Sequence, residues 1–461
     1  MKPTVVILAA GLGTRMKSGL AKALHPLAGR PLVQYVLEAA AGVGPEKILL
    51  VLGHQADKVR SAVKEFSLEI VLQAEQLGTG HAVQQAMGTI STGTGPVLIL
   101  CADTPLITTK TLKDLIELHQ KSRSAITFIT TTLDDPFGYG RVVRGKTGVM
   151  SVVEEKDATA AQRKIREVNA GIYCFDRKFL LAALTLLGKS NAQKEYYLPD
   201  TIELAKKKKH RVSAFVCGDP HEIMGVNSRY DLSRAEAVVK RRINRQWMLE
   251  GVTILDPETV FVGSEARLGR DVVLYPNVRI EGSTRIGSAS VIYPGSRIVN
   301  SVIAENVTIK DCSVIEESDI AVGAVVGPFA HLRPGSAIGA RAKIGNFVEV
   351  KKSIIGDGSK ASHLSYIGDA TVGRDVNIGA GVIICNYDGY AKYPTVIEDN
   401  VFVGSDSQLV APVRIGRGAL VAAGSTITRD VPADALAISR VPQDIREGFA
   451  NRRRRLKQRK R

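Results

Sequence analysis

The chain contains few aromatic residues and few cysteines. Aromatic residues make up 5% of its 461 positions, and Trp247 is the single tryptophan, so a core filled with aromatic rings is not expected. The five cysteines are scattered and form no Cys-x-x-Cys pair, which argues against a disulfide framework or a cysteine-bound metal. No apolar run reaches the roughly 18 residues of a membrane helix, and the N-terminus has the pattern of a strand, not of a signal peptide. We therefore expect a cytoplasmic protein without membrane contact.

Glycine and positive charge, by contrast, are abundant. The chain has 43 glycines and a formal net charge of +16, and its length exceeds one ordinary core, so at least two domains are expected. Many glycines with few aromatics favour a β-solenoid with tight corners. Part of the charge lies in a tail over residues 452–461. This tail either binds nucleic acid or is a solvated basic end, and the lack of interleaved aromatic residues favours the solvated end.

The first half alternates strand-like and helix-like segments. Apolar strand patterns cover residues 47–53, 68–72, 97–101 and 125–131, and helical patterns such as 31–40 and 112–121 lie between them. This alternation predicts a Rossmann-like, mostly parallel α/β sheet that binds ligands at the carboxyl ends of its strands. Apolar residues at helical spacing then predict a connecting helix over 229–249.

A glycine turn follows the first strand. Residues 8–15 read Leu-Ala-Ala-Gly-Leu-Gly-Thr-Arg directly after an apolar strand. Such a turn directs several backbone N–H groups to one point and forms a cradle for anions. Arg15 adds a planar pair of donors for phosphate oxygens. The run lacks the endings of the P-loop and of the dinucleotide fingerprint. Together with Met16 and Lys22, it resembles the signature of sugar-1-phosphate nucleotidyltransferases.

The pattern changes at about residue 251. Aliphatic residues recur every six positions from Leu268 to Ile298, and the series resumes at Ile320 and again at Ile397. This period predicts a parallel β-helix of hexapeptide repeats with one inward aliphatic side chain per short strand. Two interruptions are expected, one over 351–368, which contains His363, and one over 385–395. Loops inserted between regular coils are where a solenoid usually carries its function.

Residues 3 to about 448 resemble a bifunctional family of bacterial UDP-N-acetylglucosamine synthesis, which joins an N-acetylglucosamine-1-phosphate uridylyltransferase to a glucosamine-1-phosphate N-acetyltransferase. The motifs that carry the resemblance are residues 8–16, 73–82, 138–141 and 225–227 in the first half, and 345–352, 363–369, 377–381 and 385–389 in the second. The resemblance implies a left-handed β-helix and a homotrimer. It also implies a uridylyltransferase domain over 1–228, the helix 229–249, and an acetyltransferase domain with its basic tail over 250–461.

Uridylyl transfer requires charge neutralisation and needs no general base, because the attacking sugar phosphate is already ionised. Arg15 and Lys22 are the candidate catalytic cations. Asp103 ends the apolar strand 97–103 and suits Mg²⁺, although a strand-end turn residue is the alternative. The resemblance adds Asn227 as the second metal ligand. It implies that UTP and the UDP-sugar product contact Leu8, Ala9, Ala10, Gly11, Lys22, Gln73, Gly78, Thr79, Gly140, Glu154, Asn169 and Asn227.

Two positions next to these residues depart from the family pattern. Ala21 precedes Lys22 where proline is usual, and Ala102 precedes Asp103 where glycine is usual. We expect Ala21 to loosen the loop that directs Lys22, and Ala102 to add a methyl group near the metal. Neither change removes a functional group.

Acetyl transfer needs a base, because the attacking amine must lose a proton. A histidine has a pKa suited to this proton transfer, and the resemblance places the base at His363. Glu349 could orient His363 or a partner residue. The resemblance implies that glucosamine-1-phosphate contacts Arg333, Lys351, Tyr366, Asn377 and Lys392. It implies that acetyl-CoA, the co-substrate, contacts Ala380, Asn386, Tyr387, Ser405, Ala423 and Arg440.

Two alternatives belong to other classes. The solenoid could be a structural or regulatory module of a single-activity nucleotidyltransferase, but such a module would not need the 363–369 motif or the 385–389 excursion. The chain could instead be a scaffold that binds nucleic acid through its tail, which a steep salt dependence of RNA binding would reveal.

Overall fold

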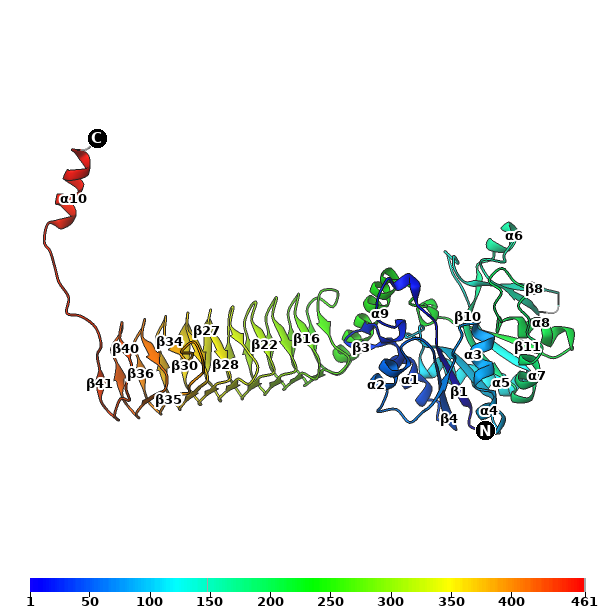
Figure 1. Cartoon of the computed structure of the whole chain (residues 1–461), viewed down its shortest axis with the longest axis horizontal. Helices are drawn as coiled ribbons and strands as arrows, with labels where there is room; N and C mark the ends of the chain where they lie inside the picture. Colours follow the sequence, from blue (N-terminus) through cyan, green and yellow to red (C-terminus); the bar gives the residue numbers. More distant parts are fainter. Residues whose placement is uncertain (147, 460–461) are drawn as a thin grey trace. The chain divides into compact units, whose positions relative to one another are not determined.

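The computed structural model describes residues 1–146 and 148–459, so Lys460 and Arg461 of the basic tail lie outside the described residues. The chain divides into two compact units, Met1–Arg242 and Ile243–Arg461. The division falls inside the helix α9 (Arg229–Leu249), which has the bounds expected from the sequence. In Figure 1 the first unit runs from blue to green, and the solenoid of the second runs from green to orange.

A mixed sheet forms the centre of the first unit, with the strand order β11-β7-β10-β6-β1-β4-β5. β1, β4, β5 and β6 are mutually parallel, and so are β7 and β11, while β10 runs antiparallel to both its neighbours. A hairpin of β8 and β9 extends from β10. The strands are β1 (Thr4–Ala9), β4 (Lys47–Leu52), β5 (Glu69–Leu72), β6 (Val97–Cys101), β7 (Ile126–Thr132), β8 (Gly140–Gly145), β9 (Gly148–Val153), β10 (Glu167–Phe175) and β11 (Val212–Val216).

Helices cover both faces of this sheet. Val5 and Ile7 point to one core cluster and Val6 to the other, as alternation along a strand requires. The first cluster is closed by α1 (Leu32–Ala41), α2 (Ala56–Ala62) and α5 (Thr109–Ser122). The second is closed by α3 (Thr79–Gln85), α4 (Met87–Ser91), α7 (Arg177–Leu184) and α8 (Asp200–Lys207). Shorter elements are α6 (Ala160–Arg163), β2 (Pro26–Leu27), β3 (Arg30–Pro31) and the 3₁₀ helices η1 (Thr14–Met16), η2 (Lys22–Leu24) and η3 (Pro220–Ile223).

The second unit is a solenoid of three parallel stacks. The first stack contains β12 (Thr253–Ile254), β15 (Val273–Leu274), β18 (Val291–Ile292), β21 (Thr308–Ile309), β24 (Val325–Val326), β27 (Lys343–Asn346), β30 (Lys360–His363), β33 (Asn377–Ile378), β36 (Phe402–Val403), β39 (Leu420–Val421) and β41 (Leu436–Ala437). The second contains β13 (Phe261–Val262), β16 (Arg279–Glu281), β19 (Arg297–Val299), β22 (Val314–Glu316), β25 (His331–Leu332), β28 (Glu349–Lys351), β31 (Tyr366–Gly368), β34 (Ile383–Cys385), β37 (Gln408–Val410) and β40 (Thr426–Ile427). The third contains β14 (Arg267–Leu268), β17 (Arg285–Ile286), β20 (Val302–Ile303), β23 (Asp319–Ile320), β26 (Ala337–Ile338), β29 (Ile354–Ile355), β32 (Ala370–Val372), β35 (Thr395–Ile397) and β38 (Val413–Ile415).

The six-residue pattern is confirmed as the solenoid core, whose buried aliphatic residues form one cluster from Val252 to Val431. The parallel stacks are consistent with a left-handed β-helix of hexapeptide repeats. Trp247 of α9 packs against this core. Asn244, one turn earlier, is fully buried and donates to the carbonyls of Pro257 and Val260 at 2.9 and 3.0 Å, so the end of α9 is fastened to the first coil.

The predicted interruption over 351–368 is wrong. β28, β29, β30 and β31 continue all three stacks, and Ile355, Ala361 and Ile367 remain in the core. Val325 pairs with Lys343, eighteen positions later, but Lys343 pairs with Lys360, seventeen positions later. A coil that is one residue shorter displaces the following inward aliphatic residues by one position in the sequence, and the β-helix continues. The second excursion is confirmed, because the chain leaves the coil between β34 and β35.

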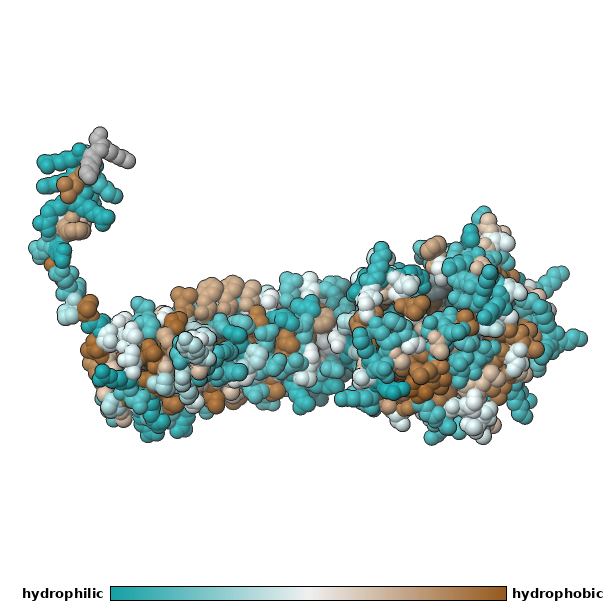
Figure 2. Space-filling view, viewed as in Figure 1, coloured by the Kyte–Doolittle hydropathy of each residue, from teal (hydrophilic) through white to brown (hydrophobic). Residues whose placement is uncertain are grey.

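The basic tail ends in α10 (Phe449–Gln458), all of whose residues are exposed. Figure 2 shows mostly hydrophilic side chains over this helix. No helix within residues 1–146 and 148–459 combines the length and apolar character needed to cross a membrane. All five cysteines are free thiols.

Candidate active sites

A cavity of about 410 Å³ opens at the carboxyl ends of β1 and β6. The glycine turn after β1 forms one wall, and Ala102 and Asp103, which follow β6, form another. Nine of the residues predicted from the sequence line it together: Leu8, Ala9, Ala10, Gly11, Lys22, Gln73, Gly78, Thr79 and Asp103. The cavity therefore lies where the parallel strands were expected to bind a ligand.

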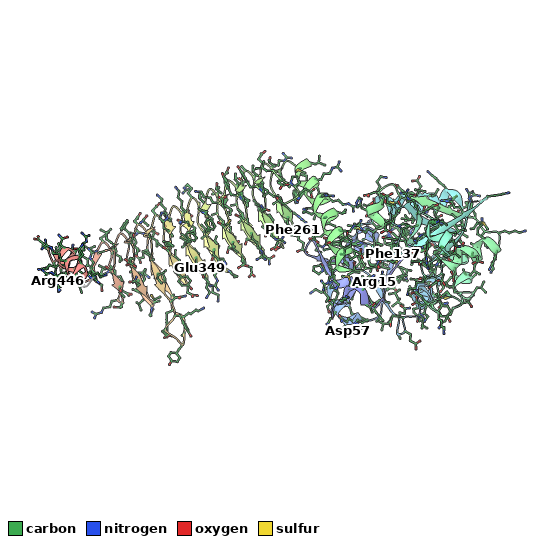
Figure 3. All side chains as sticks on the ribbon, turned by 90° about the horizontal axis from the view of Figure 1, so that it is seen from above. Arg15, Asp57, Phe137, Phe261, Glu349 and Arg446 are labelled. Carbon is green, nitrogen blue, oxygen red and sulfur yellow. The ribbon has the colours of Figure 1, made fainter. Side chains whose placement is uncertain are left out.

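Lys22 joins two oxygens that are far apart in the sequence. Its Nζ atom donates to the Asp103 carboxylate and, at 3.0 Å, to Oδ1 of Asn227. Arg15 donates to the same Asn227 oxygen at 2.9 Å; Figure 3 labels Arg15 in the first unit. The backbone places Asn227 as well, because Val226 N–H donates to the Asp103 carbonyl at 2.7 Å. Two cationic side chains, an amide oxygen and a carboxylate thus meet beside the cavity, and Lys22 and Asp103 line it.

The loop that carries Lys22 is held from both sides. Gly13 has a φ of +63°, and a Cβ atom at this position would lie 2.8 Å from the Lys22 Cβ, so the turn requires glycine. Ala21 N–H donates to Oε1 of Gln55 at 3.2 Å, a bond that a proline at this position could not make. The expectation that Ala21 loosens the loop is therefore not supported, since this bond fastens it.

Three of the residues predicted to contact the UDP-sugar, Gly140, Glu154 and Asn169, lie where the β8–β9 hairpin meets β10. Gly140 pairs with Asn169 of β10. A Cβ atom on Gly140 would lie 3.1 Å from Oε1 of Glu154, so the Glu154 carboxyl lies against this glycine. Asn169 donates to the Tyr173 hydroxyl at 2.6 Å. Burial raises the pKa of Glu154 to about 7, Asp157 and Asp200 act in the same direction, and Arg141 opposes them.

Gln73 is buried and donates to the Gly78 carbonyl at 3.3 Å. Its amide nitrogen also lies 2.9 Å from Nδ1 of His81. Thr79 accepts a hydrogen bond from Leu198 N–H at 3.1 Å. His81 therefore contacts the side chain of a predicted binding residue. Sequence reasoning did not name Gln76, Cys101 or Glu195 as lining residues. Gln76 lies within the motif 73–82 and Cys101 within the strand 97–103, both of which were singled out, while Glu195 follows no recognisable pattern.

In the solenoid, His363 lies at the corner between β30 and β31. Its Nδ1 atom lies 2.6 Å from Oδ1 of Asn346, the residue paired with it one coil earlier. Because an amide oxygen only accepts, the imidazole proton is on Nδ1, and Nε2 is free to accept a proton. Sequence reasoning missed Asn346, because repeats of six residues give a coil of eighteen and would place Gly345, not Asn346, next to His363.

Further predicted residues follow His363 along this corner. The pairings of Lys360 with Asn377, of Asn377 with Phe402 and of Phe402 with Leu420 place Ala380, Ser405 and Ala423 in successive coils at the same position as His363. Arg440 donates to the Ala423 carbonyl at 2.7 Å. Four of the six residues expected to contact acetyl-CoA therefore continue the line that His363 begins.

A second group gathers along the β28–β31–β34 stack. Arg333 donates to the Glu349 carboxylate at 2.7 Å, so Glu349 orients Arg333 and not His363; Figure 3 labels Glu349 on the solenoid. The neighbouring Lys351 ammonium group lowers the pKa of Lys392, which Asp369 and Tyr366 raise. The charges of Lys351 and Lys392 therefore lie close enough to interact.

The excursion 386–394 is tied to this second group. Asn386 is buried and donates to the Asp369 carboxylate. Its amide nitrogen and the Tyr366 hydroxyl both approach Gly368, lying 2.8 and 2.5 Å from where a Cβ would be. Tyr387 bridges to Lys392 across the loop. Within one chain, Asn386 and Tyr387 thus lie after the β34 strand, while Ala380, Ser405 and Ala423 lie at the opposite end of that stack's strands.

The fold and these sites define a class: a nucleotide-binding α/β unit with cations at a phosphate loop, joined to a hexapeptide-repeat solenoid. Comparison with known families agrees. The MobA-like NTP transferase domain family matches residues 5–184, and the bacterial transferase hexapeptide (six repeats) family matches residues 394–429.

The comparison with individual proteins is more specific. The chain is 50% identical to the bifunctional protein GlmU of Pelobacter propionicus over 96% of this chain and 97% of that protein. It is 50% identical to GlmU of Trichlorobacter lovleyi over 97% and 98% of the two chains, and 48% identical to GlmU of Shouchella clausii over 97% and 98%. The chain belongs to the family of bifunctional GlmU proteins, and the resemblance drawn from its motifs is confirmed.

Proposed function

We propose that this chain catalyses two consecutive reactions. The solenoid transfers the acetyl group of acetyl-CoA to glucosamine-1-phosphate. The α/β unit then transfers UMP from UTP to N-acetylglucosamine-1-phosphate, giving UDP-N-acetylglucosamine and diphosphate. The observation that carries the proposal is that each unit has its own candidate site: Lys22 and Arg15 contact Asp103 and Asn227 in the first unit, and the solenoid carries His363 bonded to Asn346 together with the cations Lys351 and Lys392.

The first unit is suited to hold Mg²⁺. One ammonium group contacts the Asp103 carboxylate and the Asn227 amide oxygen, so both oxygens lie within reach of a single cation. Among the described residues, no cluster of three or more His, Cys, Asp or Glu side chains could hold a metal ion. A two-ligand oxygen site suits Mg²⁺, which keeps most of its waters. When bound, Mg²⁺ supplies positive charge to the phosphate oxygens of UTP.

Uridylyl transfer then proceeds by positioning and charge neutralisation. A phosphate oxygen of the sugar attacks the α-phosphorus of UTP, forms the new P–O bond and displaces diphosphate. The backbone amides of residues 8–11, with Arg15 and Lys22, stabilise the charge that gathers on the phosphate oxygens. Gln73, Gly78 and Thr79 bind the uracil ring of UTP. Gly140, Glu154 and Asn169 bind the sugar and the ribose.

Acetyl transfer requires proton removal. Nε2 of His363 takes a proton from the amine of glucosamine-1-phosphate as that amine attacks the thioester carbonyl, and CoA leaves as the thiolate. Asn346 keeps the imidazole in the tautomer that this step needs. Arg333, Lys351 and Lys392 bind the sugar phosphate, with Tyr366 and Asn377 completing the pocket. Ala380, Asn386, Tyr387, Ser405, Ala423 and Arg440 bind acetyl-CoA.

We also propose a cytoplasmic homotrimer. The residues expected to bind acetyl-CoA lie in two groups on a single chain, one continuing the His363 corner and one on the excursion after β34. One ligand can contact both groups if neighbouring copies place one group opposite the other. Free cysteines fit a reducing compartment.

An assay by omission tests the proposal. The purified chain is supplied with glucosamine-1-phosphate, acetyl-CoA, UTP and Mg²⁺, and the products are identified by mass. UDP-N-acetylglucosamine should form with all four present. Without UTP the product should be N-acetylglucosamine-1-phosphate. If the chain uses N-acetylglucosamine-1-phosphate but never acetylates glucosamine-1-phosphate, it is a single-activity nucleotidyltransferase.

A further inference from the structure

An ion pair between the buried Arg141 and the half-buried Glu155 lies beside the carboxyl group of Glu154. Arg141 of β8 is 2% exposed. Its Nη2 atom donates to Oε2 of Glu155 at 2.7 Å, and its Nη1 atom donates to the Tyr139 carbonyl. Gly138 N–H donates to the same Glu155 oxygen at 3.2 Å. The pair therefore ties the turn 138–140 to the chain segment that leaves β9.

This segment and this turn carry two residues of the sugar pocket. Glu154 directly precedes Glu155, and Gly140 directly precedes Arg141. The Glu154 carboxyl lies against Gly140, and Gly140 pairs with Asn169. A change in the Arg141–Glu155 pair therefore moves the pocket residues themselves, although neither member of the pair belongs to the predicted binding set.

The groups that interact with Glu154 come from several elements around it, and they include Cys101 at the end of β6 and Tyr197 before α8. Asp157 follows β9, Glu195 precedes α8 and Asp200 begins α8; all three disfavour a charged Glu154, and Arg141 favours it. The buried Tyr173 hydroxyl of β10 also interacts with Glu154. The pKa of Asp200 is itself raised to about 6 by burial and by Glu203 and Asp157. The positive charge of Arg141 thus opposes several negative charges, and Glu155 offsets part of it.

We propose that Arg141 and Glu155 are a positioning pair that sets the orientation and the charge of Glu154, and thereby makes the binding of the sugar phosphate in the α/β unit dependent on pH. The inference rests on the proposed function, in which the Glu154 carboxylate accepts hydrogen bonds from the sugar. Only the ionised carboxylate accepts with both oxygens. The charge of Glu154 therefore controls affinity for the sugar phosphate, and UTP binding is affected less.

The two members of the pair have opposite effects. Replacing Glu155 by glutamine keeps acceptors for Gly138 and Arg141 but leaves the Arg141 charge uncompensated, so the pKa of Glu154 falls. Replacing Arg141 by methionine removes the opposing cation, so the pKa of Glu154 rises. Lysine at position 141 keeps the charge but loses the fork that fixes Tyr139 and Glu155 together. A purely structural pair would not produce opposite shifts.

The experiment compares full-length wild type, E155Q, R141M, R141K and E154Q in UDP-N-acetylglucosamine formation between about pH 5.5 and 9. Each reaction has saturating UTP and Mg²⁺ and varied N-acetylglucosamine-1-phosphate. Acetyltransferase activity and a melting curve of the same preparations control for folding. A rise of one unit in the pKa of Glu154, from about 7, lowers its ionised fraction about fivefold at pH 7, so R141M should raise the KM for the sugar phosphate about fivefold near pH 7 and hardly at all near pH 9. E155Q should shift the acid limb of kcat/KM to lower pH, and R141K should keep the wild-type midpoint with a higher KM.

The outcomes separate this inference from the proposed function. One outcome is that E154Q flattens the pH dependence of kcat/KM while E155Q and R141M keep the wild-type midpoint of the acid limb or shift it in the same direction. In that case the positioning pair is refuted, and the contact of Glu154 with the sugar stands. If E154Q leaves the KM for the sugar phosphate unchanged, the role of Glu154 in the proposed function fails first. Should R141M fold poorly, the R141K and E155Q midpoints still decide the outcome.

Discussion

The two sites of this chain are built in opposite ways. In the α/β unit, Lys22 bonds to Asp103 and Asn227 across 81 and 205 positions of sequence. In the solenoid, His363 bonds to Asn346 across 17 positions, the length of one coil. A sheet collects residues from the carboxyl ends of distant strands, whereas a solenoid repeats one position coil after coil. Variants should therefore damage the two activities separately.

Asp103→Ala should produce the largest separation. Loss of the carboxylate removes the proposed ligand for Mg²⁺ and the partner of Lys22, and we expect uridylyl transfer to fall by about 10³-fold, as for other losses of a charge-stabilising group. Acetylation should be unchanged. Diphosphate release and CoA release measure the two steps. Asp57→Ala, on the exposed start of α2, is the matched control. Equal loss of both activities in a folded Asp103 variant would contradict the two-site description.

His363→Ala should give the reverse pattern. Removing the base should lower acetyltransferase kcat by roughly 10² to 10⁴-fold and leave uridylyl transfer intact. The measurement is kcat against pH, with a melting curve to detect loss of packing. His331→Ala changes a solenoid histidine on β25 and serves as the control. If kcat and its pH profile remain those of wild type, His363 has no part in the mechanism.

Asn346→Ala tests whether the solenoid site depends on the neighbouring coil. Without the amide oxygen the imidazole loses the partner that holds its tautomer, and we expect acetyltransferase kcat to fall by about tenfold. The KM values should change less than kcat. Asn346→Asp retains an acceptor and should recover most of the rate. A rate for Asn346→Asp as low as that for Asn346→Ala would argue against tautomer control.

Glu154→Gln should reveal the buried charge of the α/β unit as a change in stability. The pKa of Glu154 rises from 4.5 to about 7 on folding. The contribution of this group to the free energy of unfolding is therefore fully present below pH 4.5 and is lost as the pH rises through about 7. Glutamine does not ionise. The variant should therefore gain at most about 3 kcal/mol over wild type near pH 8, and little near pH 5. Melting at both pH values measures this, with the exposed Glu117→Gln as control; an equal change at both would exclude titration as its cause.

Removal of the basic tail after residue 448 should have the smallest effect. No residue of α10 is buried, so both rates should stay within about twofold and stability within about 0.5 kcal/mol of wild type. Salt-dependent binding to RNA, measured with and without the tail, tests the alternative function. Loss of either activity on truncation would show that the tail contributes to a site.

Much of the fold was predictable because its signals are local. The strand over 97–101, the helix over 229–249 and the inward aliphatic series depend on patterns within short windows, and all three are present in the structure. The interruption over 351–368 was mispredicted because a period counted in sixes cannot register a coil of seventeen. The excursion before β35 was predictable, since its composition departs from the repeat altogether.

Runs of consecutive residues specify the two architectures, the phosphate loop and the repeat of the solenoid core, and these features can therefore be recognised before folding is considered. Folding is what brings Lys22 to both Asp103 and Asn227, Glu349 to Arg333, and Arg141 and Glu155 to the turn beside Glu154. Contacts of this kind depend on which strand ends meet and which side chains are buried together, and burial also sets the charge of Glu154. The order of residues in short sequence motifs predicts neither these long-range contacts nor the burial of individual side chains.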